Sequence, residues 1–388
     1  MSSDLNDDGM YMEIQTAIRD LCSRFPSSYW RELDESRMYP ERFVEALTDA
    51  GWLSILIPER YGGGGRSLSE ASIVLEEINA SGGNAAACHG QMYTMAPILR
   101  HGSEEQRERY LPEIAKGQLR LQAFAMTEQD SGSDITRIRT SAVREGDSYI
   151  INGQKVFTSR VQHSDLMLLL ARTTKRENQS RSTDGLSLFI IDLRQAGDTI
   201  EVNPIKTMFN HETNEVLIRN LKTNSSQLIG EEGKGFSYVL DGFNAERILL
   251  AAECVGDGRW FCAKGAEYAT HREVFDRPIG RNQGVQFPLA RAYASVTAAG
   301  LMRRSAAGLF DAGHPCGPEA NMAKLLASEA AWQAANACLD THGGYGFAAE
   351  YDVERKFRET RLYQTAPIAN NLVLAYIGHH VMGMPRSY

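Results

Sequence analysis

The sequence has no long apolar run. Its 388 residues contain no stretch that approaches the roughly 20 apolar residues that a membrane-spanning helix needs. The first residues, MSSDLNDDGMYMEI, are acidic. They lack the basic-then-apolar pattern of a secretory signal peptide and the Arg-rich composition of a mitochondrial presequence. We therefore expect no membrane insertion and a cytoplasmic, bacterial protein.

Cysteine pairs with metal-binding spacing are also absent. No cysteine belongs to a C-x-x-C pair or to a tight Cys/His cluster, so we expect no metal site. Most of the cysteines have apolar neighbours and are expected to be reduced core residues. The six are Cys22, Cys88, Cys254, Cys262, Cys316 and Cys338.

The chain lacks an excess of positive charge. It has 41 Lys and Arg against 49 Asp and Glu, which gives a formal net charge of -8. This balance argues against nucleic acid as the main partner, because nucleic-acid binding relies on cationic surfaces. An anionic ligand remains compatible with the sequence, since a local cationic patch suffices to bind one.

The length and the periodicity predict several domains. A single core rarely exceeds roughly 250–300 residues, so two or three packed domains are expected. Residues 1–121 show helical patterns, including a capping box at Ser103–Gln106. Residues 122–230 are rich in short β-prone runs, and residues 231–388 return to helical spacing. The expected helices of this last region are 236–270, 286–312, 320–340 and 368–382.

Turn signals divide the middle region into strands. Gly146-Asp147 predicts one hairpin and Asn152-Gly153 a second, because these residues tolerate positive φ. The runs LMLLLA and LSLFIIDL are candidate buried strands, separated by a polar loop that we expect to be exposed. Short antiparallel strands of this kind are typical of a barrel or sandwich.

The segment Phe124–Asp134, FAMTEQDSGSD, begins as a strand and opens into a turn rich in small and hydroxyl residues. Such a turn exposes backbone and side-chain donors that can hold a phosphate or the polar edge of a flat ring. The alternative is an ordinary strand-to-turn connection. Taken alone, the segment does not decide between these two interpretations.

FAMTEQDSGSD is similar to the FAD-binding signature of acyl-CoA dehydrogenases, and NGQKVFTSR follows it at the spacing of that family. The resemblance covers essentially the whole chain. It implies an α+β multidomain protein with an N-terminal helical domain, a middle antiparallel β-barrel domain and a C-terminal four-helix-bundle domain. It also implies FAD as cofactor. The flavin contacts that it implies in the middle domain are Phe124, Met126, Thr127, Gly132, Ser133, Phe157, Thr158 and Ser159.

Two C-terminal motifs resemble the family's contacts with FAD across a subunit boundary. Arg272-Glu273-Val274-Phe275 and Gln283 match the segment that reaches the pyrophosphate and adenosine, a role that suits the planar donors of Arg. The second motif contains Asp340, His342, Gly343 and Gly344, where glycine lets a ligand approach the backbone closely. The alternatives are a surface charge for Arg272 and a plain helix terminator for the glycines.

The family's usual catalytic base is missing. Much of the family carries a Glu in the loop after a stretch like Arg361-Leu362-Tyr363-Gln364, but Pro367 occupies that position here. A smaller set of relatives places the base on a helix, in an E-R pair that Glu246-Arg247 matches. The resemblance therefore implies Glu246 as the base, with a solvated helix Glu as the alternative. It implies substrate contacts from Ser133, Asn244 and Arg247.

Pro367 also affects the thioester oxygen, which the family holds partly by a backbone N–H at this position. Proline has no N–H. We hypothesise that the N–H of Ile368 or another donor takes over. Ala369 and Asn371 match further flavin contacts of the same loop. Asn84 lies near where glutaryl-CoA relatives carry an arginine, so we do not expect a dicarboxylic substrate of that kind.

Three functions follow from the resemblance. The first is an acyl-CoA dehydrogenase, an oxidoreductase and flavoprotein of fatty acid metabolism, in which Glu246 removes the α-proton and flavin N5 accepts hydride from Cβ. It would pass electrons to an electron-transfer flavoprotein and form a homotetramer, a dimer of dimers. The second is a flavin oxidase or monooxygenase on the same fold. The third is a non-catalytic FAD-binding subunit of a hetero-oligomer.

Overall fold

The computed structural model describes residues 4–387, which form two compact units. We call residues 37–66 and 86–243 the sheet unit. Residues 4–36, 67–85 and 244–387 form the helical unit. The order of helical, β and helical regions along the chain is confirmed. The domain boundaries at 121/122 and 230/231 stay a prediction.

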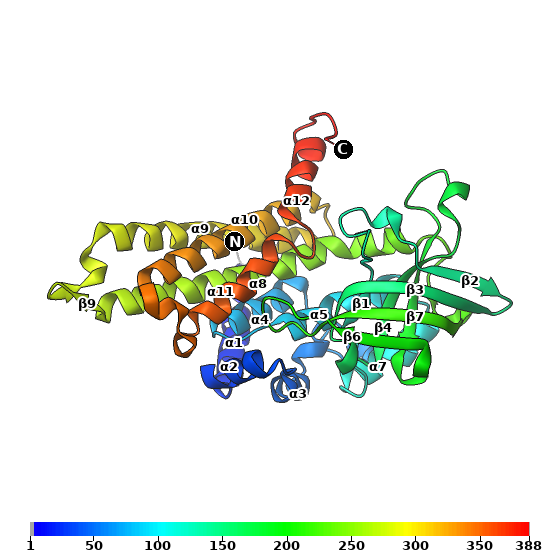
Figure 1. Cartoon of the computed structure of the whole chain (residues 1–388), viewed down its shortest axis with the longest axis horizontal. Helices are drawn as coiled ribbons and strands as arrows, with labels where there is room; N and C mark the ends of the chain where they lie inside the picture. Colours follow the sequence, from blue (N-terminus) through cyan, green and yellow to red (C-terminus); the bar gives the residue numbers. More distant parts are fainter. Residues whose placement is uncertain (1–3, 388) are drawn as a thin grey trace. The chain divides into compact units, whose positions relative to one another are not determined.

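The sheet unit contains an eight-stranded sheet, in the order β6-β7-β3-β2-β4-β5-β8 with β1 beside β4 (Figure 1). Neighbouring strands are antiparallel except where β1 and β2 meet β4. LMLLLA and LSLFIIDL form β4 and β5, as predicted. The strands are β1 (Ala123–Ala125), β2 (Ser141–Glu145), β3 (Ser148–Ser159), β4 (Leu166–Arg172), β5 (Leu186–Asp192), β6 (Ile200–Pro204), β7 (Thr213–Asn224) and β8 (Leu228–Ile229).

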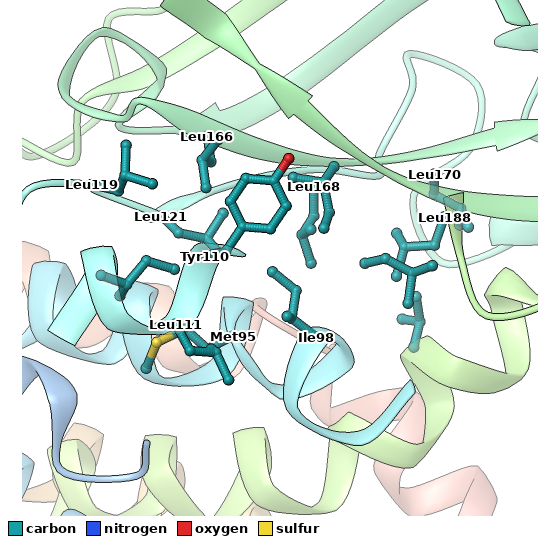
Figure 2. Packing of buried hydrophobic residues seen from close by; sticks show 14 of the residues in the cluster. Met95, Ile98, Tyr110, Leu111, Leu119, Leu121, Leu166, Leu168, Leu170 and Leu188 are labelled. Atoms are coloured by element: carbon teal, nitrogen blue, oxygen red, sulfur yellow. The ribbon is translucent and has the colours of Figure 1, made fainter. Parts of the chain in front are cut away.

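Both faces of β4 are buried, which explains its unbroken apolar sequence. Successive side chains of a strand point to opposite faces, so the even-numbered leucines enter one core cluster and the odd-numbered residues another. Figure 2 shows the first cluster, in which Leu166, Leu168 and Leu170 face Ile98 and Leu111 of the neighbouring helices. These helices are α5 (Ala86–Thr94), α6 (Ala96–His101) and α7 (Glu104–Ala115), while α3 is Glu41–Asp49.

The predicted capping box at the start of α7 is confirmed. The Ser103 hydroxyl accepts a hydrogen bond from the Gln106 N–H at 3.1 Å, and the Ser103 N–H donates to Gln106 Oε1 at 3.0 Å. The Gln106 amide also donates to the carbonyls of Ser226 and Leu228, at 2.8 and 2.9 Å. One side chain therefore both starts the helix and attaches it to the edge strand β8.

One of the two predicted hairpins is wrong. Gly146-Asp147 does connect β2 and β3, but Asn152-Gly153 lies inside β3, at a register shift in its pairing with β7. A Cβ on Gly153 would lie 2.3 Å from Thr140 Oγ1 and 2.7 Å from Thr140 Cα. Pairing with β7 on both sides of this point overrides the local turn propensity. The glycine is needed for close approach and not for a turn.

The helical unit contains long helices that confirm the predicted C-terminal pattern. In Figure 1, α9 and α10 run side by side. Residues 368–382, predicted as one helix, form α12 followed by a π-helical turn, Ile377–Val381. The helices are α1 (Asp4–Ser23), α2 (Ser27–Ser36), α4 (Leu68–Ala80), α8 (Gly235–His271, in this unit from Asn244), α9 (Gln283–Asp311), α10 (Gly317–His342), α11 (Val353–Arg361) and α12 (Asn370–Tyr376).

Glycines bring α8 close to its neighbours. A Cβ on Gly258 would lie 2.5 Å from Val296, and one on Gly265 would lie 2.7 Å from Leu289, both side chains of α9. A Cβ on Gly256 would lie 2.3 Å from the carbonyl oxygen of Glu76 in α4. The contact surface of α8 therefore requires small residues at these positions.

Buried ion pairs tie the helices of this unit together. Glu76 and Glu77 of α4 both accept from Arg259 of α8 at 2.8 Å, and Glu76 also pairs with Arg303 of α9 at 2.5 Å. Lys356 of α11, whose side chain is fully buried, lies 2.5 Å from Asp257 of α8. Burial raises the pKa of Asp257 to about 6, although Lys356 opposes this shift.

Two further predictions from the sequence concern the state of the cysteines and membrane insertion. All six cysteines are buried and none forms a disulfide, as predicted. Within the described residues, no helix combines the length and the apolar composition needed to cross a bilayer.

The replacement Gly153→Val tests the close approach of β3 to Thr140. The added side chain meets backbone as well as side-chain atoms, so we expect a loss of about 1–3 kcal/mol of unfolding free energy or more. Urea unfolding followed by circular dichroism measures this loss. Gly242→Ala in the same unit is the control, because its Cβ would have its nearest neighbour at 3.9 Å. Equal stability of the two variants would show that the strand tolerates a side chain at 153.

Candidate functional site

The turn after β1 is attached to β3 by two contacts. The Val156 N–H donates to the Thr127 carbonyl at 2.9 Å, and Lys155 Nζ donates to the Met126 carbonyl at 3.0 Å. Glu128 and Ser131 then close a tight turn through two backbone hydrogen bonds. The structure therefore brings the predicted residues Met126 and Thr127 next to the predicted contact strand around Phe157.

A buried ion pair joins the turn after β1 to β3. Lys155 is 0% exposed, and its Nζ lies 2.9 Å from Glu128 Oε1. The Glu128 carboxylate also accepts the N–H groups of Arg139 and Thr140, at 2.7 and 2.9 Å. Burial alone would raise the pKa of Glu128, but the Lys155 charge and these hydrogen bonds outweigh it, so the pKa is lowered. The pKa of Lys155 falls to about 8, because burial outweighs the attraction of Glu128.

The predicted residues at the end of β3 have an unusual geometry. Phe157 has a φ of +58° and is 64% exposed, at a register irregularity between Lys155 and Thr158. A left-handed conformation is costly for a bulky residue and is often found at functional sites. Thr158 is buried, and its hydroxyl has no hydrogen-bond partner among the described residues. The exposed ring of Phe157 and the unsatisfied hydroxyl of Thr158 are therefore adjacent in the chain. The partly buried Ser159 comes next.

The other described residues predicted to contact FAD in the sheet unit have no unusual backbone geometry and no buried unsatisfied polar group. Phe124 is the central residue of β1 and pairs with Leu168, while its ring lies 6.2 Å from that of Tyr93. Gly132 and Ser133 are exposed on the turn. A Cβ on Gly132 would meet no atom within 4 Å, so neighbouring atoms do not require a glycine at this position.

Sequence reasoning missed a charged cluster that follows β3. Arg160, also left-handed, is buried and lies 3.2 Å from the Glu212 carboxylate and 3.4 Å from His211 Nδ1. Burial and the Arg160 charge hold the pKa of His211 well below its usual value, so this imidazole is neutral. Because these residues are about 50 positions apart in the chain, no local motif signalled the contact.

In the helical unit, six of the predicted cofactor residues line one cavity of about 820 Å³. They are Arg272, Phe275, Asp340, His342, Gly343 and Gly344. Gln283 is not among the lining residues, although its neighbours Asn282 and Val285 are. Tyr268 and Tyr345, which sequence reasoning missed, also line it. The volume falls in the range of about 300–1,000 Å³ that is typical of ligand pockets.

The cavity rim carries an exposed aromatic residue. Phe275 is 93% exposed at the tip of the two-residue strands β9 (Glu273–Val274) and β10 (Arg277–Pro278), and both it and Asp276 have positive φ. The Arg272 guanidinium lies 5.8 Å from the Tyr345 ring. A cation and aromatic surfaces therefore meet at one opening, as binding a phosphate-linked aromatic group requires.

His342 offers an unsatisfied acceptor at this cavity. It is 3% exposed and stacks on Tyr268 at 4.1 Å. Its Nδ1 lies 2.8 Å from the Cys338 carbonyl, which identifies Nδ1 as the protonated nitrogen. Nε2 then has a free lone pair and no partner among the described residues. Burial lowers the pKa of His342. A hydroxyl or amine donor of FAD would satisfy Nε2, so these residues fit the cofactor.

The glycines beside His342 leave space for a ligand. Gly343 ends α10 with a φ of +56°, and a Cβ on Gly343 or Gly344 would meet no atom within 4 Å. The chain turns here, so the helix-terminator interpretation holds for Gly343. Open space on the cavity side is what close approach of a ligand requires.

The predicted base and two predicted substrate contacts lie on α8, and two predicted flavin contacts lie after α11. Glu246 is 8% exposed, and the Arg247 guanidinium donates to Asn244 Oδ1 at 3.3 Å. Burial lowers the pKa of Arg247, although the charge of Glu246 opposes this shift. Ala369 is the N-cap of α12, and Asn371 lies in its first turn. Burial of Glu246 contradicts the alternative of a solvated helix residue.

Comparison with known proteins gives matches along nearly the whole chain. Three family models match: the acyl-CoA dehydrogenase N-terminal domain at residues 11–118, the middle domain at 123–221 and the C-terminal domain at 233–377. The acyl-CoA dehydrogenase FadE12 of Mycobacterium tuberculosis is 33% identical, over 97% of this chain and 98% of its own. The 3-(aryl)acrylate reductase of Clostridium sporogenes is 32% identical, over 93% of this chain and 96% of its own.

Solved structures also match. The glutaryl-coenzyme A dehydrogenase in complex with glutaryl-CoA has a TM-score of 0.90 and 27% identity. The match covers 97% of this chain and 96% of that one.

The pair Lys155–Glu128 should make stability depend on pH. Because the pKa of Glu128 is lower in the folded state, its contribution is present above the unfolded pKa and is lost as pH falls through the folded one. Glu128→Gln leaves a buried ammonium without its carboxylate, so we expect a loss of about 3–5 kcal/mol at pH 7. The difference from the native protein should begin to shrink at pH 4, because the unfolded carboxyl, whose ordinary pKa is 4.5, takes up a proton before the folded one does.

Urea unfolding at the two pH values measures this effect. Glu145→Gln, at an exposed position of the same sheet, is the matched control and should unfold like the native protein at both. A destabilisation by Glu128→Gln that stays constant with pH would contradict the assigned role of the charge.

Proposed function

The chain belongs to the acyl-CoA dehydrogenase family, and on this basis we propose that it oxidises an acyl-CoA thioester to the trans-2-enoyl-CoA with Glu246 as base. It is an FAD-dependent oxidoreductase that acts on acyl-CoA, as this family is. The oxidative direction of the reaction, the base Glu246 and the thioester substrate are proposed. One of the relatives is a reductase, so the titration described below also tests the direction of the reaction.

The observation that carries the proposal is the buried Glu246 next to Arg247 on α8. A carboxylate in a dehydrated site is an effective base for the α-proton of a thioester. The loop after α11 offers no alternative, since Pro367 has no ionisable group and its neighbours Ala366 and Ile368 are apolar. Glu246 therefore removes the α-proton, and bound FAD supplies the hydride acceptor for Cβ.

Each unit carries residues that we propose contact FAD. In the sheet unit, Phe157 offers a ring to one face of the flavin, and the Thr158 hydroxyl offers an unsatisfied polar group. In the helical unit, the guanidinium of Arg272 and Nε2 of His342 suit the phosphates and a donor of the adenosine half. Phe124, Met126, Thr127, Gly132, Ser133, Ser159, Phe275, Gln283, Asp340, Gly343, Gly344, Ala369 and Asn371 complete the proposed set.

Substrate binding is assigned to Ser133, Asn244 and Arg247. Negative charge develops on the thioester oxygen as the α-proton leaves, and it needs donors. Pro367 provides no N–H. We assign this task to a backbone N–H that follows Pro367 in the same segment, in place of the family's usual donor.

The proposal extends to partners. We propose an electron-transfer flavoprotein as electron acceptor, a homotetramer built as a dimer of dimers, and a cytoplasmic enzyme of fatty acid metabolism.

Anaerobic titration with a panel of acyl-CoA thioesters tests the function. We expect the flavin absorbance near its main visible band to bleach with at least one thioester, and Glu246→Gln to slow this bleaching about 10²-fold or more. Glu267→Gln, an exposed carboxylate on the same helix, is the control and should bleach at the native rate.

Other outcomes of the titration identify the competing functions. Rapid reoxidation of the bleached flavin by air would favour an oxidase or monooxygenase. No bleaching by any thioester, together with co-purification of a homologous chain, would favour a non-catalytic subunit.

Arg272 should contribute to FAD retention. Removing one charged hydrogen-bonding group costs about 1.5–3 kcal/mol, so Arg272→Met should weaken FAD binding about tenfold to a hundredfold. Equilibrium dialysis of FAD against the flavin-depleted protein measures this change. Arg281→Met, at an exposed arginine outside the lining of the cavity, should bind FAD like the native protein. An unchanged dissociation constant for Arg272→Met would remove Arg272 from the cofactor site.

A further inference from the structure

Lys324 of α10 holds the segment that carries Pro367. Its side chain is 0% exposed. Its Nζ donates to the Ile368 carbonyl at 2.7 Å and to Asn370 Oδ1 at 2.6 Å. The hydroxyl of Ser328, one helical turn further along α10, donates to the same Asn370 oxygen at 3.2 Å. Two side chains of α10 therefore anchor the residues between Pro367 and α12.

This buried ammonium differs from the other two buried lysines. Lys155 pairs with Glu128, and Lys356 pairs with Asp257 and Glu359. No carboxylate lies within 4.0 Å of Lys324 Nζ in the part of the chain that the structure describes. The charged and titratable groups that face it are the Cys254 thiol and Arg247 of α8 and Glu329 of α10. Burial lowers the pKa of Lys324 to about 8.

An ammonium in this position is not explained by stability. A buried charge without an opposite charge costs free energy even when it is hydrogen-bonded. Methionine has a similar length and would fill the same space without that cost. If replacing a residue would make the fold more stable, that residue is a candidate for a role in function.

The geometry shows what the ammonium does to the backbone. In a trans peptide the C=O and N–H groups point in opposite directions. Because the Ile368 carbonyl points to Lys324, the N–H of Ala369 in the same peptide points away from α10. Among the described residues, no acceptor is found for this N–H. A cation bonded to the carbonyl also polarises the peptide and makes its N–H a stronger donor.

We propose that Lys324 is a positioning residue of the reaction: by bonding the Ile368 carbonyl, it turns and polarises the Ala369 N–H so that this group donates to the thioester oxygen. This assignment rests on the proposed function and deepens it. It replaces the N–H that the chain loses at Pro367 with one that lies two residues further on. Lys324 acts through the peptide and does not touch the substrate.

The replacement Lys324→Met tests the proposal. In the FAD-loaded protein we expect the rate of flavin bleaching at saturating acyl-CoA to fall about 10-fold to 10³-fold, as it does when an oxyanion donor is lost. The concentration of acyl-CoA at half-maximal rate should change less than about threefold, because the donor acts mainly on charge that develops during the reaction. The melting temperature should stay equal or rise. Ser328→Ala, which removes the neutral anchor of Asn370, is the matched control and should bleach near the native rate.

The pH profile separates positioning from a merely structural role. Since the pKa of Lys324 is about 8, the native rate should fall as pH rises through 8 and the ammonium loses its proton. Lys324→Met should lack this alkaline limb, and Lys324→Gln, which keeps a donor without the charge, should lack it too. A native rate in Lys324→Met, a retained alkaline limb, or a melting temperature clearly below that of the native protein would each overturn the proposal.

A measurement without turnover distinguishes this proposal from the proposed function. The carbonyl stretch of a bound enoyl-CoA thioester, measured by infrared difference spectroscopy, should lie at lower frequency in the native protein than in Lys324→Met. Equal frequencies, together with normal bleaching by the native protein, would overturn the role of Lys324 alone. If the native protein neither bleaches with any acyl-CoA nor shifts the enoyl-CoA carbonyl, the proposed function fails and the role of Lys324 falls with it.

Discussion

The pairing of buried charge is the constraint on which both units depend. A charged side chain taken out of water must meet an opposite charge or several hydrogen-bonding groups. In the helical unit, Lys356 satisfies this requirement through Asp257 and Glu359, and Glu76 does so through Arg259 and Arg303. These pairs join α8 to α4 and α11, and α4 to α9.

Further hydrogen bonds attach neighbouring segments of the helical unit, and one ion pair fixes a turn of the sheet unit. Arg355 and Lys356 of α11 donate to the carbonyls of Gly82 and Gly83, which fixes the loop after α4. Asn79 at the end of α4 bonds the Ala85 N–H, the Glu253 carbonyl and the Tyr363 hydroxyl, the last of which lies just before the Pro367 segment. In the sheet unit, Lys155 and Glu128 fix the turn after β1 against β3. Against this background, the unpaired charge of Lys324 stands out.

Local signals in the sequence were sufficient for the elements and for several site residues. The capping box at Ser103, the apolar runs of β4 and β5 and the long helical patterns after residue 231 depend on neighbouring residues alone, so they were predictable. Arg272, His342 and Gly344 were identified by resemblance, and the structure places them around one cavity. The family membership followed from motifs in order along the chain.

The tertiary structure decided what depends on residues distant in the chain. Asn152-Gly153 has the local preference of a turn, yet pairing with β7 keeps it inside β3 and makes the glycine a point of close approach to Thr140. Lys155 and Lys324 look like surface residues in sequence, and only their partners 27 and 44 positions away show why they are buried. The sequence by itself determined the family and most of the helices and strands, because short-range periodicity and motifs encode both. Which charges are buried, and which of them lacks a carboxylate, was decided by packing, because burial is a property of the folded chain and not of any segment.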